Sequence, residues 1–218
     1  MKIGIIGAGH IGGTLTRRFA ELGHDVSVAN SRGPHTLADL ASKSGAHAVT
    51  VKDAVRDKDV VIVTIPEKRI PDLPAGLFDA ANESTVVVDT GNYYPQRDGR
   101  IDAIEAGTPE SRWVSEQLGR PVVKAFNNIV ARHLLENGRP AGDAHRIALP
   151  VAGDDPGAKK VVLRLVDELG FDGVDAGSLD ESWKQQPGTP VYAADLDAAG
   201  VRRALAEAQR ERPAGFRA

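Results

Sequence analysis

The sequence predicts an α/β fold with a doubly wound, mostly parallel sheet and a short C-terminal α/β extension. Short, almost continuously apolar runs rich in Val and Ile recur along the chain, which is typical of strands covered by helices on both faces. Segments with helical patterning separate these runs, and such alternation implies right-handed crossovers and a parallel sheet. The expected strands are residues 2–6, 25–29, 47–50, 59–65, 85–89, 121–125 and 145–149.

Three of the expected helices have clear limits. The first covers residues 11–22, with an apolar face that includes Leu15 and Phe19, and it stops at Gly23. Another begins at Asp155-Pro156, because Asp is a good N-cap and Pro suits the first helical position. A last amphipathic helix is expected over residues 198–211.

Length and composition exclude several classes of protein. The chain has 218 residues, a formal net charge of −3, no cysteine and 5% aromatic residues. The missing cysteines exclude disulfides, thiolate zinc sites and cysteine nucleophiles, and the weak negative charge disfavours nucleic-acid binding. No apolar stretch is long enough to cross a membrane, which predicts a cytoplasmic protein. We expect a main domain over residues 1–140 and a small extension over residues 141–218 that packs on the same sheet.

A glycine-rich motif lies directly after the first expected strand. Gly7, Gly9 and Gly12 form a G-x-G-x-x-G pattern that also contains His10 and Ile11 and opens a helix. The first glycine permits a tight turn, the second lets a pyrophosphate approach the backbone, and the third lets the helix pack on the strand. The helix N-terminus offers free N–H groups to that anion. The motif therefore predicts a Rossmann-type dinucleotide site, and the alternative is a glycine-rich turn without a ligand.

The end of the second strand indicates which dinucleotide is bound. A site that prefers NAD places an acid there for the ribose 2′-hydroxyl. This chain instead has Asn30, Ser31 and Arg32, which are neutral donors and a guanidinium suited to phosphate oxygens. We therefore predict NADP(H). A solvated loop arginine is the alternative for Arg32.

The nicotinamide half is expected across the carboxyl ends of the first, fourth and fifth strands. Asn127 and the adjacent Asn128 follow the sixth strand on the same edge, where their amides could hold a carboxamide or a second ring system. Structural turn residues are the alternative at each position. The candidates at these strand ends are Thr64, Ile65, Pro66, Thr90, Asn92, Ala125, Phe126 and Asn127.

The sequence contains no recognisable general acid or metal site. Tyr93, Tyr94 and Tyr192 lack the lysine four residues later that a short-chain dehydrogenase needs, and the six histidines do not have metal-ligand spacing. We therefore predict no catalytic side chain and no metal. A hydride enzyme of this kind suits an acceptor that is itself a redox cofactor, because such transfer needs chiefly ring alignment and water exclusion.

Several segments resemble the family of NADP oxidoreductases that depend on coenzyme F420, a deazaflavin. They are residues 4–12, 30–32, 122–128 and 151–155, and residues 183–190 resemble a bacterial branch. The resemblance implies hydride transfer between NADP(H) and the deazaflavin, with Ser31 and Arg32 at the 2′-phosphate and Phe126 near the joined rings. It also implies a homodimer.

Two alternatives to deazaflavin reduction stay open. One is an NADPH-dependent reductase of another acceptor, such as a flavin, a quinone or an imine. The other is a module that senses NADP without turnover, which would bury the nicotinamide face. Trp183, in the least regular part of the extension, is a candidate for stacking on an acceptor, although packing or an interface is preferred.

Overall fold

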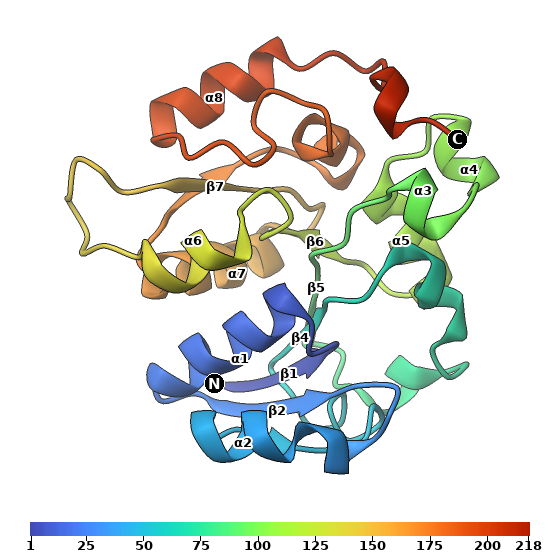
Figure 1. The fold of residues 1–218 in the computed structure, drawn as a ribbon, viewed down its shortest axis with the longest axis vertical. Helices are drawn as coiled ribbons and strands as arrows, with labels where there is room; N and C mark the ends of the chain where they lie inside the picture. Colours follow the sequence, from blue (N-terminus) through green and yellow to red (C-terminus); the bar gives the residue numbers. More distant parts are fainter.

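The computed structural model describes residues 1–218 and contains a six-stranded sheet in which all neighbouring strands are parallel. The order β3-β2-β1-β4-β5-β6 places β1 and β4 in the middle, so the strand order reverses between them (Figure 1). This confirms the predicted doubly wound sheet. Its strands are β1 (Lys2–Ile6), β2 (Asp25–Ala29), β3 (His47–Ala48), β4 (Val60–Val63), β5 (Val86–Asp89) and β6 (Val123–Lys124).

Helices connect most of the strands, but the connection from β3 to β4 contains only turns and that from β4 to β5 only 3-10 segments. The α-helices are α1 (His10–Glu21), α2 (Ala38–Ser44), α3 (Pro95–Asp98), α4 (Asp102–Glu105), α5 (Glu110–Leu118), α6 (Ala131–Glu136), α7 (Pro156–Glu168) and α8 (Ala198–Glu207). The 3-10 segments are η1 (Pro34–Leu37), η2 (Glu67–Asp72), η3 (Leu77–Ala80), η4 (Leu179–Gln185) and η5 (Ala214–Phe216). None of the helices is long and apolar enough to cross a membrane.

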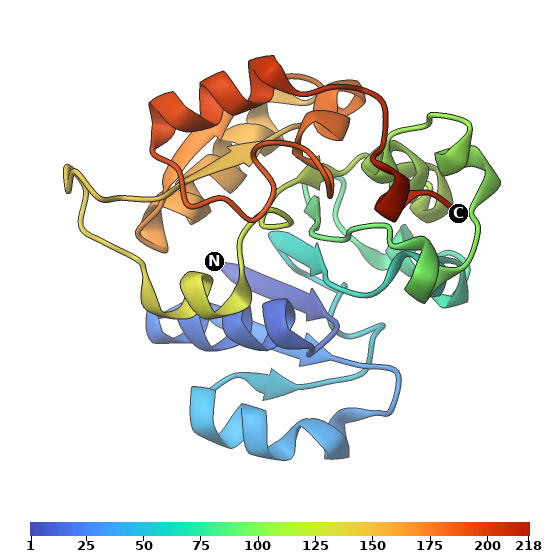
Figure 2. The ribbon, with the colours of Figure 1, turned by 45° about the horizontal axis from the view of Figure 1, so that its top comes forward.

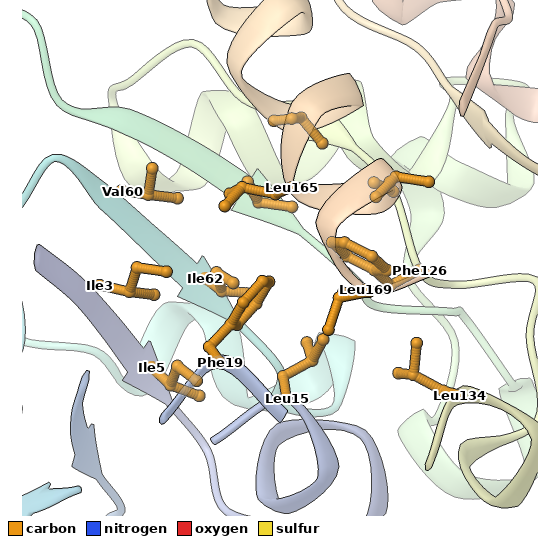
Figure 3. Packing of buried hydrophobic residues seen from close by; sticks show 14 of the residues in the cluster. Ile3, Ile5, Leu15, Phe19, Val60, Ile62, Phe126, Leu134, Leu165 and Leu169 are labelled. Atoms are coloured by element: carbon orange, nitrogen blue, oxygen red, sulfur yellow. The ribbon is translucent and has the colours of Figure 1, made fainter. Parts of the chain in front are cut away.

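The two faces of the sheet bury separate apolar clusters because side chains alternate along a strand. In β1, Ile3 and Ile5 belong to the larger cluster, whereas Ile6 belongs to the smaller one. Figure 3 shows Phe19 of α1 against the β1 and β4 side chains of the larger cluster. Burying an aliphatic or aromatic side chain of this size contributes about 1.5–3 kcal/mol, so this cluster fixes α1 on the sheet.

The C-terminal extension has a small sheet of its own. Strand β7 (Ala148–Val151) pairs in parallel with β8 (Asp172–Asp175), and one antiparallel bridge between Lys124 and Ala152 links it to the end of β6. The strand expected at 145–149 begins three residues later, and α8 ends at Glu207 rather than at residue 211. Figure 2 shows α8 at the opposite end of the molecule from α2.

Helix α7 joins the extension to the main sheet. Its N-cap Asp155 accepts a hydrogen bond from the Ala158 N–H, which confirms the predicted start of this helix. Leu165 and Leu169 belong to the same apolar cluster as Ile3 of β1 (Figure 3). The two parts of the chain therefore share one core.

Arg18 adds a polar link between the same parts. Its guanidinium donates to the carbonyl groups of Leu134 and Leu135 in α6 and to that of Leu169 at the end of α7, at 2.8–2.9 Å. Carbonyl groups in the last turn of a helix have no partner within that helix. One side chain of α1 therefore caps two other helices.

Candidate functional site

The turn between β1 and α1 has the geometry of a phosphate loop. Gly7 has φ +107°, a conformation that favours glycine, and its N–H donates to Ala29 of β2 at 2.8 Å. Thr64, directly after β4, donates through Oγ1 to the Gly7 carbonyl group at 2.8 Å. A Cβ atom at Gly12 would collide with the Gly7 carbonyl and with the Thr64 hydroxyl. Two of the three glycines are therefore required by the loop itself.

The N-terminus of α1 is open to a ligand. Its N-cap Gly9 has no side chain that could accept from the first N–H groups, and no atom lies within 4 Å of where a Cβ would stand. His10 is exposed and Ile11 is half-buried at the start of the helix. The helix therefore presents free N–H donors and the positive end of its dipole to an anion.

A cavity of about 700 Å³ lies in front of this loop, at the carboxyl ends of β1, β2 and β4. It is large enough for a substantial part of a dinucleotide, since ligand pockets typically measure about 300–1,000 Å³. The predicted site residues that it brings together are Gly7, Gly9, Asn30, Ser31, Arg32, Thr64, Ile65 and Pro66.

The loop after β2 forms one wall of the cavity. The Asn30 side chain accepts from the Arg32 N–H at 3.0 Å and donates to the Thr36 hydroxyl at 2.9 Å, so this loop is ordered by its own hydrogen bonds. Ser31 and Arg32 are exposed, and the Arg32 guanidinium makes no hydrogen bond or ion pair. Arg32 is therefore free to bind an anion.

The opposite wall of the cavity consists of residues 64–69 after β4, and we call it the β4 wall. It adds two cations that were not predicted from the sequence. Lys68 and Arg69 line the cavity together with Asp72, which pairs with Arg69 at 2.8 Å. With Arg32, three cations face one carboxylate, which favours a polyanionic ligand. The sequence does contain a signal for these two cations, which is a basic pair shortly after Pro66, at the end of a predicted strand.

The other predicted residues lie outside the lining of this cavity. Gly12 packs under the loop, and Thr90, Ala125 and Phe126 are buried. The side chain of Asn127 is also buried and is engaged by the protein, because it bonds to Asn92 at 3.0 Å, to the Gln185 carbonyl at 2.7 Å and to the Gln185 amide at 2.9 Å.

Two further side chains from the sequence reasoning have definite positions. Trp183 is half-buried, with Lys184 and Arg210 lying 5.9 and 5.7 Å from its ring centre. Tyr94 and Tyr192, which are far apart in the sequence, meet through their hydroxyl groups. Desolvation and the neighbouring Tyr192 hydroxyl raise the pKa of Tyr94.

Beside the β4 wall lies a group of buried charges that the sequence reasoning also missed. We call it the buried charge cluster, and its members are Glu67, Asp89, Asp98, Glu110 and Lys124. Lys124 of β6 is fully buried and donates to Asp89 at 3.0 Å and to the Gly91 carbonyl at 2.6 Å. Asp89 also accepts from the Ser111 hydroxyl at 2.7 Å. Burial alone would lower the pKa of Lys124, but Asp89 and Glu110 raise it above its usual value.

Two glutamates of the cluster are completely buried. Glu110 accepts from Arg212 of the C-terminal segment at 2.6 Å, yet desolvation raises its pKa despite the cations Lys124 and Arg212. Neither carboxyl oxygen of Glu67 has a hydrogen-bond partner. Desolvation and the nearby Asp89 hold the pKa of Glu67 well above its ordinary value. No three His, Asp or Glu side chains are arranged to hold a metal ion.

Comparisons with known proteins agree with this geometry. Residues 2–93 match the model of the family described as NADP oxidoreductase, coenzyme F420-dependent. In solved structures, the chain is 33% identical to hypothetical protein SMa0349 of Sinorhizobium meliloti, with a TM-score of 0.76 over 90% of this chain and 95% of that chain. A protein of Arthrobacter sp. FB24, described as an F420-dependent NADP reductase, is 23% identical, with a TM-score of 0.64 over 84% of this chain and 87% of that one.

A curated protein of Escherichia coli K12, YjhV, is 49% identical over 69 residues. That match covers 32% of this chain and about half the length of YjhV, at 50%.

Proposed function

Because the chain belongs to the family of coenzyme F420-dependent NADP oxidoreductases, we propose that it transfers hydride between NADP(H) and a deazaflavin. The family assigns the class of enzyme, an NADP-dependent oxidoreductase. The deazaflavin as the second substrate is supported by the family description and by the described activity of the Arthrobacter protein.

The carrying observation is the cavity between the phosphate loop and the unpaired Arg32. It combines an uncapped helix N-terminus, an open approach at Gly9, and three cations on facing walls. These features fit the pyrophosphate and the 2′-phosphate of NADP(H), which are its two anionic groups.

Each part of the cavity has a separate task in this proposal. The α1 N-terminus binds the pyrophosphate, and Ser31 and Arg32 bind the 2′-phosphate. Ile65 and Pro66 direct the nicotinamide half toward the carboxyl ends of β4 and β5. When bound, the nicotinamide would donate or accept the hydride, so the protein has to align the two rings and exclude water rather than provide a nucleophile.

Arg32→Ala should weaken NADPH binding much more than NADH binding. Losing one charged contact costs on the order of 1.5–3 kcal/mol. NADH has no phosphate on its ribose, so it makes no such contact with Arg32 and should lose little affinity. Titration calorimetry with both nucleotides measures the effect, and Arg203→Ala on the exposed face of α8 is the control. Equal losses for the two nucleotides would show that Arg32 does not read the 2′-phosphate.

The acceptor is tested by an anaerobic assay. The protein is mixed with NADP and reduced coenzyme F420, and the return of the oxidised deazaflavin absorbance is followed. We expect a rate that scales with protein and falls strongly in Arg32→Ala. Binding of NADPH without any return of absorbance would reject the deazaflavin and leave a flavin, quinone or imine as the acceptor, or a sensor without turnover.

A further inference from the structure

The β4 wall of the cavity contains one residue that faces away from the ligand space. Residues 64–66 and 68–69 line the cavity, whereas the Glu67 side chain between them is fully buried. It lies against the turn after β5, because a Cβ atom at Gly91 would collide with its carboxyl oxygen. The Glu67 side chain therefore packs this wall against the end of β5.

The surroundings of Glu67 are strongly acidic. The groups that face it are Asp89 of β5, Lys124 of β6, Glu110 of α5, and Asp98 and Arg97 of α3. Every other carboxyl group of the buried charge cluster has a cation as hydrogen-bond donor. The pairs are Lys124–Asp89, Arg97–Asp98 and Arg212–Glu110.

This pairing leaves one carboxyl group without a counter-charge. Four buried acids face three cations, and an unpaired carboxylate ion buried among them would cost several kcal/mol. Glu67 is the acid for which no donor is available. The hydrogen-bond inventory therefore identifies Glu67 as the group that carries a proton.

We propose that Glu67 is a neutral carboxylic acid that positions the β4 wall, and that its ionisation releases this wall and weakens cofactor binding. The buried carboxylate would have neither a donor nor a cation of its own and would face Asp89 and Glu110. It can reach water only if residues 64–69 move away from the β5 turn. The binding part of this proposal rests on the proposed function, whereas the protonation and the release of the wall do not.

The protonation is tested by unfolding Glu67→Gln and the wild type in urea between pH 5 and 9. The unfolded carboxyl titrates near 4.5, and its pKa is raised in the folded state. The contribution of the Glu67 carboxyl to stability is therefore complete below pH 4.5, and it is lost as the pH rises to the pKa of Glu67 in the folded protein. Above pH 4.5 the unfolding equilibrium constant of the wild type should rise up to tenfold per pH unit relative to Glu67→Gln. A difference that does not change with pH would overturn the proposal.

The matched control is Glu116→Gln, an exposed glutamate of α5 that makes no hydrogen bond or ion pair. It removes the same charge, and its stability relative to the wild type should stay nearly constant over this range. A slope as large as that of Glu67→Gln would show that the effect is not due to burial of Glu67.

Release of the wall is measured by hydrogen exchange of residues 64–70 without cofactor. At each pH the exchange rate of the wild type is divided by that of Glu67→Gln, which removes the intrinsic pH dependence. We expect this ratio to rise at alkaline pH, and a constant ratio would contradict the movement.

The NADPH dissociation constant is measured over the same range. In the wild type this dissociation constant should rise tenfold per pH unit above the pKa of Glu67 in the folded protein, because the form with protonated Glu67, which binds NADPH, becomes rarer. In Glu67→Gln the dissociation constant should not rise in this way. Parallel profiles would overturn the coupling to binding. Absence of NADPH binding at every pH would refute the proposed function, while unfolding and exchange would still decide the role of Glu67.

Discussion

Lys124→Met should destabilise the protein by about 3–5 kcal/mol at pH 7, the range found when one partner of a buried ion pair is removed. Methionine has a similar length and leaves little cavity, so the loss comes mainly from the charges that remain. Asp89 loses its cation, and Glu110 loses one of the two positive charges that oppose it.

The loss in Lys124→Met should grow with pH. Lys124 is charged at both pH 5 and pH 8, since its pKa is raised above its usual value of 10.5. Without it the pKa of Glu110, which Lys124 now lowers, rises further, so proton uptake relieves the variant at pH 5 more than at pH 8. Urea unfolding at the two pH values measures the difference, and Lys160→Met on the exposed face of α7 is the control. A loss below about 1 kcal/mol at pH 8 would mean that the pair contributes no more than a surface salt bridge.

Gly9→Val should abolish dinucleotide binding while leaving the fold intact. The N-cap conformation of Gly9, φ −73° and ψ −161°, is open to any residue, and its Cβ position is free of protein atoms. The new side chain would occupy the space through which a pyrophosphate approaches the backbone. We expect at least a 100-fold loss of NADPH affinity, or about 2.8 kcal/mol.

Titration calorimetry measures the loss of NADPH binding in Gly9→Val, and thermal unfolding shows whether the fold is intact. Gly215→Val, at another position with free space, is the control for introducing valine. Gly12→Val should instead unfold the protein, because its Cβ would collide with the Gly7 carbonyl. Unchanged NADPH affinity in folded Gly9→Val would place the phosphate site elsewhere.

Local sequence patterns were sufficient to predict the sheet and the glycine turn between β1 and α1. Strand β1 and the Gly7 turn follow from neighbouring residues, because apolar runs and glycine positions encode them directly. Asp155 was recognised as an N-cap for the same reason, and the structure confirms it.

The buried charge cluster could not be predicted in this way. Glu67, Asp89 and Lys124 are far apart in the sequence, and each alone resembles an exposed residue of a loop or strand end. Only the strand order brings the ends of β4, β5 and β6 together. Nothing in the sequence indicated that the Asn127 amide donates a hydrogen bond to Gln185, because that contact depends on how the C-terminal extension packs against the end of β6.

The shared core and the hydrogen bonds of Arg18 make the six-stranded sheet and the C-terminal extension depend on each other. The segment that matches the family model, residues 2–93, ends before α6 and α7, whose carbonyl groups Arg18 caps. Cutting the chain after residue 93 would remove all three carbonyl acceptors of the Arg18 guanidinium, whereas cutting it at residue 140 would remove only that of Leu169. Either cut would expose the apolar surface that α7 covers. The extension is therefore part of the core that holds α1 on the sheet, and residues 1–140 alone would leave apolar surface exposed.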